Sequence, residues 1–319
     1  IPLYISLLVV LILSTVACSK QEKTEEGIIK INENGLPIMQ PLPEELPQLS
    51  AAFVQDKKYG ASLFFDKIWS EKNDNVSFLV AKNGHIIYEN YMGFANKSTD
   101  EKITRETPLH IASVSKVLTA TATLMLVDAK KLKLDQKVTT IIENFPYPDV
   151  TIQTLLNHRS GMKNYAYFTF ENNNWDKKKT LTNADIIKVM VEKEIPLERK
   201  TDTGFSYNNT NYAVLALIIE KITGLTYAEA MSEMIFKPLG MDNTFVFDME
   251  KHKGNVAPSY KGNNMEIGLD YLDGIYGDKN IYSTPRDLLK FDTARYASFF
   301  LNPDLITKIY QGYSYESKG

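Results

Sequence analysis

The sequence is poor in the residues from which disulfides and metal centres are built. Cys18 is the only cysteine among 319 residues, so the chain can form neither an intrachain disulfide nor a zinc site of several thiolates. The four histidines never occur at the H-x-x-x-H spacing of zinc peptidases. We therefore expect no metal and no other cofactor.

An excess of positive charge is missing as well. Lys and Arg number 36 and Asp and Glu number 39, which gives a formal net charge of −3. Proteins that bind nucleic acids usually concentrate positive charge, so this balance argues against a nucleic-acid partner. Hydrophobic residues make up 44% and charged residues 24%, values that are ordinary for a globular protein and exclude a wholly disordered chain.

The first residues have the character of an export signal. Residues 1–17 contain no charge and are dominated by Leu, Ile and Val. This segment is short for a membrane span and suits the apolar region of a signal peptide. Because the chain starts with Ile1 instead of Met, we expect the segment to be incomplete.

The apolar segment ends at the lone cysteine. Ser14-Thr15-Val16-Ala17-Cys18 resembles the lipobox of bacterial lipoproteins, although Thr15 replaces the usual aliphatic residue. We expect residues 1–18 to be a lipoprotein signal segment, with Cys18 lipidated and the protein anchored in the bacterial cell envelope, facing the periplasm or the exterior. The alternative is an uncleaved anchor with an incidental cysteine. Both interpretations predict that the rest of the chain is exported.

A change of composition separates this signal from the folded part. Residues 19–50 are rich in charge at first and then contain four prolines, which prevent a continuous helix and favour an extended spacer. We expect a tether over 19–50 and a folded domain over 51–319.

Hydrophobic patterns predict both strands and helices in the folded part. Residues 77–81 and 85–91 are rich in β-branched, aromatic and aliphatic side chains, and Asn83-Gly84 between them suits a tight turn, so we expect a β-hairpin. Residues 113–129 form a helix that is apolar nearly all round, which is typical of a helix at the centre of a domain. Further helices are expected over 151–158, 183–192, 212–222 and 227–236, and after Thr284-Pro285. This mixture predicts an α+β or α/β domain.

An S-x-x-K motif begins the apolar helix. Residues three apart share one helix face, so the Ser113 hydroxyl and the Lys116 amine can touch. A serine is a poor nucleophile until a base takes its proton, and a lysine in an apolar setting can act as that base. The alternative is a helix-capping serine followed by a solvated lysine. Ser115 is a competing nucleophile, but its neighbour Lys116 points to a different face.

The same motif occurs again at Ser160-Gly161-Met162-Lys163, in a segment that ends a helix. Such a place is usual for a structural serine.

A Y-x-N triplet, Tyr207-Asn208-Asn209, lies in a predicted loop before the 212–222 helix. A phenol beside a lysine can relay protons, and an asparagine can orient that lysine and bind a substrate amide. Tyr88-Glu89-Asn90 repeats the triplet inside the predicted hairpin, where a structural tyrosine is expected.

Together these residues resemble the serine β-lactamase and penicillin-binding protein superfamily. The branch that they resemble contains class C β-lactamase-like proteins, D-alanyl-D-alanine carboxypeptidases and esterases. The resemblance extends from about Asn75 onward and rests on five stretches that occur in the family's order: 110–116, 150–162, 204–212, 238–241 and 282–288.

The resemblance implies a fold and a set of roles. The fold would be α+β and β-lactamase/transpeptidase-like, with an antiparallel sheet flanked by helices and a mainly helical subdomain. Ser113 would be the acylated nucleophile and an oxyanion-hole donor, Lys116 its base, Tyr207 a proton relay and Asn209 a contact of the substrate and of the lysine. His158 belongs to one of the stretches, and we interpret it as structural.

The expected function is that of a serine acyl hydrolase acting on a β-lactam, a peptidoglycan peptide ending in D-Ala-D-Ala, or an ester. The alternative is a penicillin-recognising binding lipoprotein without turnover. The family's third motif, K-T-G or H-x-G, normally follows the 282–288 stretch at a distance. His252-Lys253-Gly254 fits H-x-G but precedes that stretch in a polar segment, so we expect the third motif and the last sheet strands to lie beyond Gly319.

Overall fold

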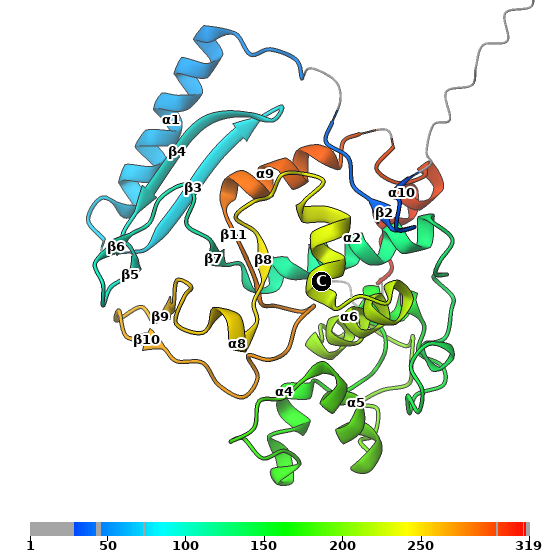
Figure 1. Cartoon of the computed structure of the whole chain (residues 1–319). Helices are drawn as coiled ribbons and strands as arrows, with labels where there is room; N and C mark the ends of the chain where they lie inside the picture. Colours follow the sequence, from blue (N-terminus) through cyan, green and yellow to red (C-terminus); the bar gives the residue numbers. More distant parts are fainter. Residues whose placement is uncertain (1–28, 43–45, 73, 298, 315, 317–319) are drawn as a thin grey trace, which may run out of the picture.

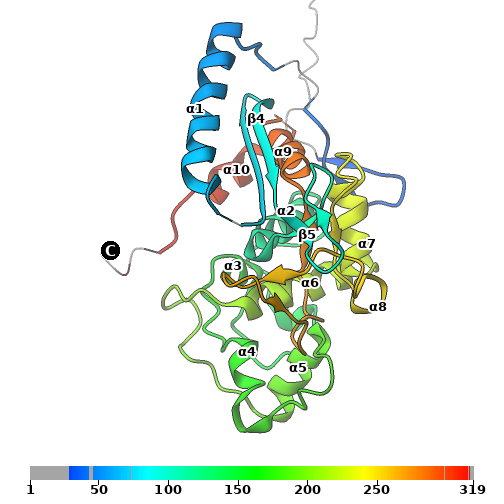
Figure 2. The same cartoon turned by 90° about the vertical axis from the view of Figure 1, so that its left-hand side faces the viewer.

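A computed structural model describes residues 29–42, 46–72, 74–297, 299–314 and 316 (Figure 1). Cys18 and the expected signal segment lie outside the described residues. A β-hairpin and the helices packed on it form one end of the molecule, and a mainly helical part forms the other (Figures 1 and 2). No helix within the described residues is long and apolar enough to cross a membrane.

The predicted hairpin is present. Strands β3 (Val76–Lys82) and β4 (His85–Met92) pair antiparallel. Asn83 and Gly84 both adopt positive φ angles, of 49° and 71°, which the turn between the strands requires. These local signals are strong, and this explains why the sequence alone located the hairpin.

Two helices cover the hairpin. Helix α1 (Ala51–Trp69) contacts β4, and its Phe65 and Trp69 rings lie 5.0 Å apart and pack against Phe78 of β3. Helix α9 (Pro285–Ala294) contacts β3. It begins with Thr284 as its N-cap and a proline in the first turn, as the sequence predicted.

The central helix is buried, as its apolar pattern predicts. A 3₁₀ turn over Ala112–Val114 leads into helix α2 (Ser115–Asp128), which packs against helix α6 (Asn209–Thr223). Leu118 and Met125 of α2 have no exposed surface. Because neighbouring elements surround α2, its first turn is held in a fixed position.

The other helices are short. Helix α5 (Asn183–Glu192) has the predicted bounds, whereas the predicted 151–158 helix is shorter. The remaining helical elements are α3 (Ile152–Leu156), α4 (Tyr165–Phe168), α7 (Tyr227–Met231), a π-helical turn (Ser232–Phe236), α8 (Met249–His252), α10 (Pro303–Ile309) and 3₁₀ turns at Val138–Thr140 and Glu171–Asn173.

Every strand pair in the described part of the chain is antiparallel, and the α+β expectation is confirmed. The strands form several small sheets in place of one continuous sheet. One of them has three strands, in the order β7 (Leu109–His110), β11 (Ile281–Ser283) and β8 (Phe245–Val246). The others pair β1 (Lys30–Ile31) with β2 (Pro37–Ile38), β5 (Phe94–Asn96) with β6 (Glu101–Lys102), and β9 (Ser259–Tyr260) with β10 (Glu266–Ile267).

The segment before α1 differs from the expected tether. Ile29, Leu36 and Met39 are buried in the core of the domain. The backbone N–H of Met39 donates to the Met234 carbonyl across 2.8 Å. The prolines prevent a helix here, as expected, but these apolar side chains dock this part of 19–50 onto the domain.

Candidate active site

The structure brings Ser113 and Lys116 together. Ser113 lies in the 3₁₀ turn and is exposed, whereas Lys116, in the first turn of α2, is only 6% exposed. Lys116 Nζ lies 3.0 Å from Ser113 Oγ. A neutral amine at this distance can accept the serine proton, so the pair has the geometry of a nucleophile and its base.

A strained residue precedes the serine. Ala112 has a φ of 46°, a left-handed conformation that non-glycine residues rarely adopt. Such conformations cost about 1–3 kcal/mol and cluster at functional sites. The turn places Ser113 at the N-terminal end of α2, where the helix dipole favours negative charge that develops on the oxygen.

Tyr207 completes a three-residue cluster with this pair. Its hydroxyl donates to Ser113 Oγ across 2.9 Å, and its ring centroid lies 5.0 Å from Lys116 Nζ. The ring is half exposed, so the phenol borders solvent as well as the serine. Ser113 Oγ therefore lies between an amine and a phenol, and each of these groups can exchange a proton with it.

The turn that presents Tyr207 is fixed by His158. The His158 ring lies 4.6 Å from the Tyr207 ring, and its Nδ1 accepts the Asn208 backbone N–H across 3.1 Å. Burial, with a further contribution from the Lys116 charge, lowers the pKa of His158 to about 4. The neutral ring can therefore accept that N–H at ordinary pH, which agrees with the structural role expected of His158.

Asn208 is a site residue that the sequence analysis missed. Its side chain caps α6 by accepting the Thr210 backbone N–H across 2.9 Å. Asn is among the preferred N-cap residues, so this signal was present in the sequence. Because of this cap, α6 begins at Asn209 and not at 212, and Asn209 lies in the first helical turn instead of a loop.

The expected contact between Asn209 and Lys116 is absent within the described residues. Asn209 Oδ1 is buried without a hydrogen-bond partner, and Lys116 Nζ donates instead to the Asp278 main-chain carbonyl across 2.8 Å. The prediction is corrected on this point because the segment before β11 supplies the acceptor.

Asp278 is the second residue that the sequence analysis missed. Gly277, with a φ of 93°, lies so close to α6 that a Cβ would be 2.5 Å from the Tyr212 carbonyl oxygen. Only glycine permits this approach, which brings the Asp278 carbonyl to Lys116. The glycine followed by an acid, shortly before a buried strand, was the available signal.

The competing serines have structural roles. Ser160 is buried and its hydroxyl donates to Asn211 Oδ1 across 2.5 Å, while Lys163 faces Glu171 at 3.8 Å. Ser115 is also buried, and its Oγ accepts the Ile281 backbone N–H across 3.2 Å. Neither hydroxyl is paired with a lysine as Ser113 is.

The other repeated motifs also lie outside the cluster. Asn90 donates to the Tyr88 hydroxyl within β4, as expected of a structural tyrosine. His252 ends the short helix α8, where its Nδ1 accepts the Asp248 backbone N–H across 2.9 Å. The H-x-G triplet at 252–254 is therefore not on a strand beside Ser113.

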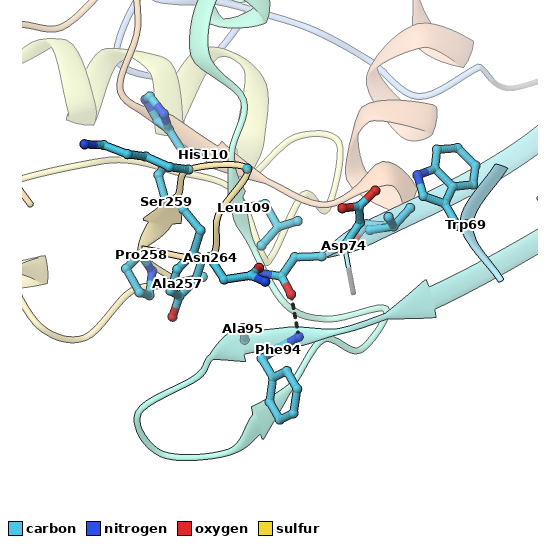
Figure 3. Close-up of a pocket in the computed structure, with 16 residues that line it drawn as sticks. Trp69, Asp74, Phe94, Ala95, Leu109, His110, Ala257, Pro258, Ser259 and Asn264 are labelled. Atoms are coloured by element: carbon cyan, nitrogen blue, oxygen red, sulfur yellow. Dashed lines mark hydrogen bonds between the residues drawn. The ribbon is translucent and has the colours of Figure 1, made fainter. Parts of the chain in front are cut away.

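A pocket of about 620 Å³ lies next to the strand that leads to the serine (Figure 3). Its described lining residues include His110 but not Ser113, with others contributed by the end of α1, by β5 and by residues 257–264. Within the described residues, no group of three or more His, Cys, Asp or Glu side chains could hold a metal ion.

Comparisons with known proteins show which family this chain resembles. A family model described as Beta-lactamase matches residues 62–307. Penicillin-binding protein 4* of Bacillus subtilis (strain 168) is 30% identical over 266 residues, which are 78% of this chain and 58% of the relative. The teichoic acid D-alanine hydrolase of Staphylococcus aureus is 27% identical over 243 residues, which are 75% of this chain and 58% of the relative.

The fold comparison points to the same group. The crystal structure of FmtA from Staphylococcus aureus superimposes with a TM-score of 0.66 at 25% identity, covering 84% of this chain and 73% of that one. This chain spans 58% of the length of the two curated relatives named above. Since the family model covers most of the chain and includes the whole Ser113 cluster, the protein belongs to the beta-lactamase family, within the serine β-lactamase and penicillin-binding protein superfamily.

Proposed function

We propose that this chain contains the nucleophile and base of a serine acyl hydrolase. The observation that supports this most is the position of Ser113 Oγ, 3.0 Å from Lys116 Nζ and 2.9 Å from the Tyr207 hydroxyl. An exposed serine between a buried amine and a phenol is suited to form and release an ester of its own hydroxyl.

The proposed reaction has two steps. In the first, Ser113 Oγ attacks the acyl carbonyl carbon, its proton passes to the neutral amine of Lys116, and the bond from that carbon to the leaving nitrogen or oxygen breaks. Tyr207 relays a proton to the leaving group. In the second step, water attacks the acyl-enzyme, the ester bond to Ser113 breaks, and the acid is released with the serine proton restored.

The substrate class is proposed from the residues and the relatives together. Asn209 Oδ1 is buried without a hydrogen-bond partner, and we propose that the amide turns toward a bound substrate and accepts a hydrogen bond from an N–H, as present in β-lactams and in D-Ala-D-Ala peptides. One relative is named a teichoic acid D-alanine hydrolase, which agrees with hydrolysis of a bond to D-alanine. An ester is the third possible substrate. We propose an envelope location, with Cys18 as the lipid anchor.

Covalent labelling tests the proposal. The full-length protein, including the sequence that carries the third motif, is treated with a fluorescent penicillin and, separately, with a fluorophosphonate, and the adduct is placed by mass spectrometry after digestion. We expect the adduct on Ser113 and release of the acid from nitrocefin or a p-nitrophenyl ester. Labelling that persists without turnover would favour the penicillin-recognising binding lipoprotein. An adduct on Ser160, or labelling that survives Ser113→Ala, would contradict the assignment.

A further inference from the structure

Asp278 is a buried acid without a role in the proposed reaction. Its side chain has no exposed surface. One carboxyl oxygen, Oδ2, accepts the Tyr165 hydroxyl across 2.7 Å, and the other, Oδ1, is buried without a partner. A buried carboxyl with half of its acceptor capacity unused is costly, so its retention at this position calls for an explanation.

The position of this acid relates it directly to the catalytic amine. The main-chain carbonyl of Asp278 is one of two hydrogen-bond acceptors of Lys116 Nζ, and Gly277 fixes that carbonyl against α6. The Tyr165 hydroxyl fixes the side chain of the same residue from the direction of α4. A single residue thus presents both a neutral acceptor and an ionisable group beside Lys116.

We propose that Asp278 is a positioning residue for Lys116. The carboxyl of Asp278 sets how readily Lys116 gives up its proton. This inference rests on the proposed function. A negative carboxyl near the amine stabilises the ammonium form, which cannot accept the serine proton. A neutral carboxyl leaves Lys116 with only neutral hydrogen-bond acceptors and favours the free amine.

The electrostatic surroundings agree with such coupling. Burial raises the pKa of Asp278, while the Tyr165 hydrogen bond and the charges of Lys116 and Lys279 oppose that rise. A charge interaction is mutual, so the ionised carboxyl favours the charged form of Lys116 as strongly as Lys116 favours the carboxylate.

Other titratable groups face Asp278 and Lys116 from the neighbouring elements, and their charges act on these two residues as well. They are Tyr165 of α4, Tyr227 of α7, Tyr212 of α6, Tyr207 and His158 beside Lys116, and Lys279, which pairs with Asp273 at 3.4 Å. Burial raises the pKa of Tyr165, Tyr212 and Tyr227 and lowers that of His158. These four groups therefore stay neutral near pH 7.

The test compares Asp278→Asn with the unaltered chain. The amide keeps the shape and can still accept the Tyr165 hydroxyl, but it never becomes negative. The rate of Ser113 labelling by a fluorophosphonate is measured from pH 5 to pH 10. We expect the acidic limb of this profile to move toward lower pH by about one unit. Asp304→Asn, a carboxyl-to-amide change at an exposed position in the first turn of α10, is the matched control and should leave the limb in place.

A second measurement does not depend on activity. The ε-carbon resonance of Lys116, assigned by its loss in Lys116→Arg, is followed by NMR as the pH rises. Its titration midpoint should move to lower pH in Asp278→Asn, and in the unaltered chain it should show a further small step as Asp278 titrates. Tyr165→Phe, which deletes one hydroxyl, should move the midpoint in the same direction by a smaller amount, because it disfavours the carboxylate.

The outcomes separate the two proposals. If Ser113 in the unaltered chain is not labelled, the proposed function fails, while the NMR titration still decides the role of Asp278. If labelling occurs and both the limb and the Lys116 midpoint stay unchanged in Asp278→Asn, the carboxyl has no influence on the amine and the inference is overturned. A uniform loss of rate with an unmoved limb would also overturn it, since that pattern indicates a purely structural role.

Discussion

The Tyr207 hydroxyl meets Ser113 Oγ across 2.9 Å, although 94 residues separate them in the chain. The serine comes from the start of α2 and the tyrosine from the turn before α6, and these two helices pack against each other. The helix pairing therefore sets the distance between nucleophile and phenol, and a change in that packing would alter the site without touching either residue.

Tyr207→Phe keeps the ring and deletes the hydroxyl. It should lower kcat by about 10²-fold or more, the usual weight of one acid/base group, while folding stays intact. Steady-state hydrolysis of an activated ester and of an amide measures the effect. Tyr296→Phe, at a tyrosine that is 76% exposed, is the control and should leave kcat unchanged. An unchanged kcat in Tyr207→Phe on both substrates would remove the phenol from the mechanism.

The two S-x-x-K serines should respond in opposite ways to alanine substitution. Ser113→Ala should abolish covalent labelling and leave stability nearly unaltered, because the hydroxyl is exposed. Ser160→Ala should retain labelling but lose about 1–2 kcal/mol of stability, since it leaves the Asn211 acceptor unsatisfied in a buried place. Gel fluorescence and urea unfolding measure the two effects. If Ser160→Ala lost labelling but kept full stability, Ser160 would be the nucleophile and Ser113 the structural serine.

Local sequence signals predicted the elements around the site well. The turn residues Asn83-Gly84 located the hairpin, and the apolar pattern after Ser113 located the buried helix. The spacing of Ser113 and Lys116 predicted their contact, because residues three apart share a helix face. These predictions depend on neighbours in sequence, so a single chain is enough to make them.

Contacts between distant segments were not predictable in the same way. Asp278 reaches Lys116 across 162 residues, only because Gly277 can lie against α6. In the described part of the chain, Lys116 Nζ donates to the Asp278 carbonyl and not to Asn209. Which carbonyl accepts a hydrogen bond from a given donor depends on how the loops pack, and spacing along the sequence does not contain that information.

Cys18 lies outside the described residues, and its lipidation stays a prediction. Expressed in bacteria with its native start restored, the protein should incorporate labelled palmitate and fractionate with membranes. Cys18→Ser should abolish the incorporation, because no other cysteine is present. One acyl chain binds a membrane only marginally, so stable fractionation would indicate several chains. Unchanged lipid labelling in Cys18→Ser would leave the uncleaved anchor as the explanation.

His158 should make the fold sensitive to acid. Its pKa is about 4 in the folded chain, against an ordinary value of 6.5. Between these values the unfolded chain binds more protons than the folded one, so stability falls as the pH drops from about 6.5 toward 4. The full shift corresponds to at most about 3 kcal/mol, and partial exposure of the ring reduces the expected loss at pH 5 to about 1 kcal/mol.

Urea unfolding at pH 5, 7.5 and 8.5 measures this loss in the unaltered chain and in His158→Gln. The glutamine cannot be protonated, so the variant should lose about 1 kcal/mol less than the unaltered chain between pH 7.5 and pH 5. Between pH 7.5 and 8.5 the two should change in parallel, because the histidine is neutral in both the folded and the unfolded state.

Protonation of His158 would also break the contact from the Asn208 N–H to Nδ1 that fixes the turn carrying Tyr207. The labelling rate of Ser113 should therefore fall as the folded protein approaches pH 4. Equal acid sensitivity of the two proteins would show that His158 is already charged or fully solvated in the folded state, and its role in holding the Tyr207 turn would be wrong.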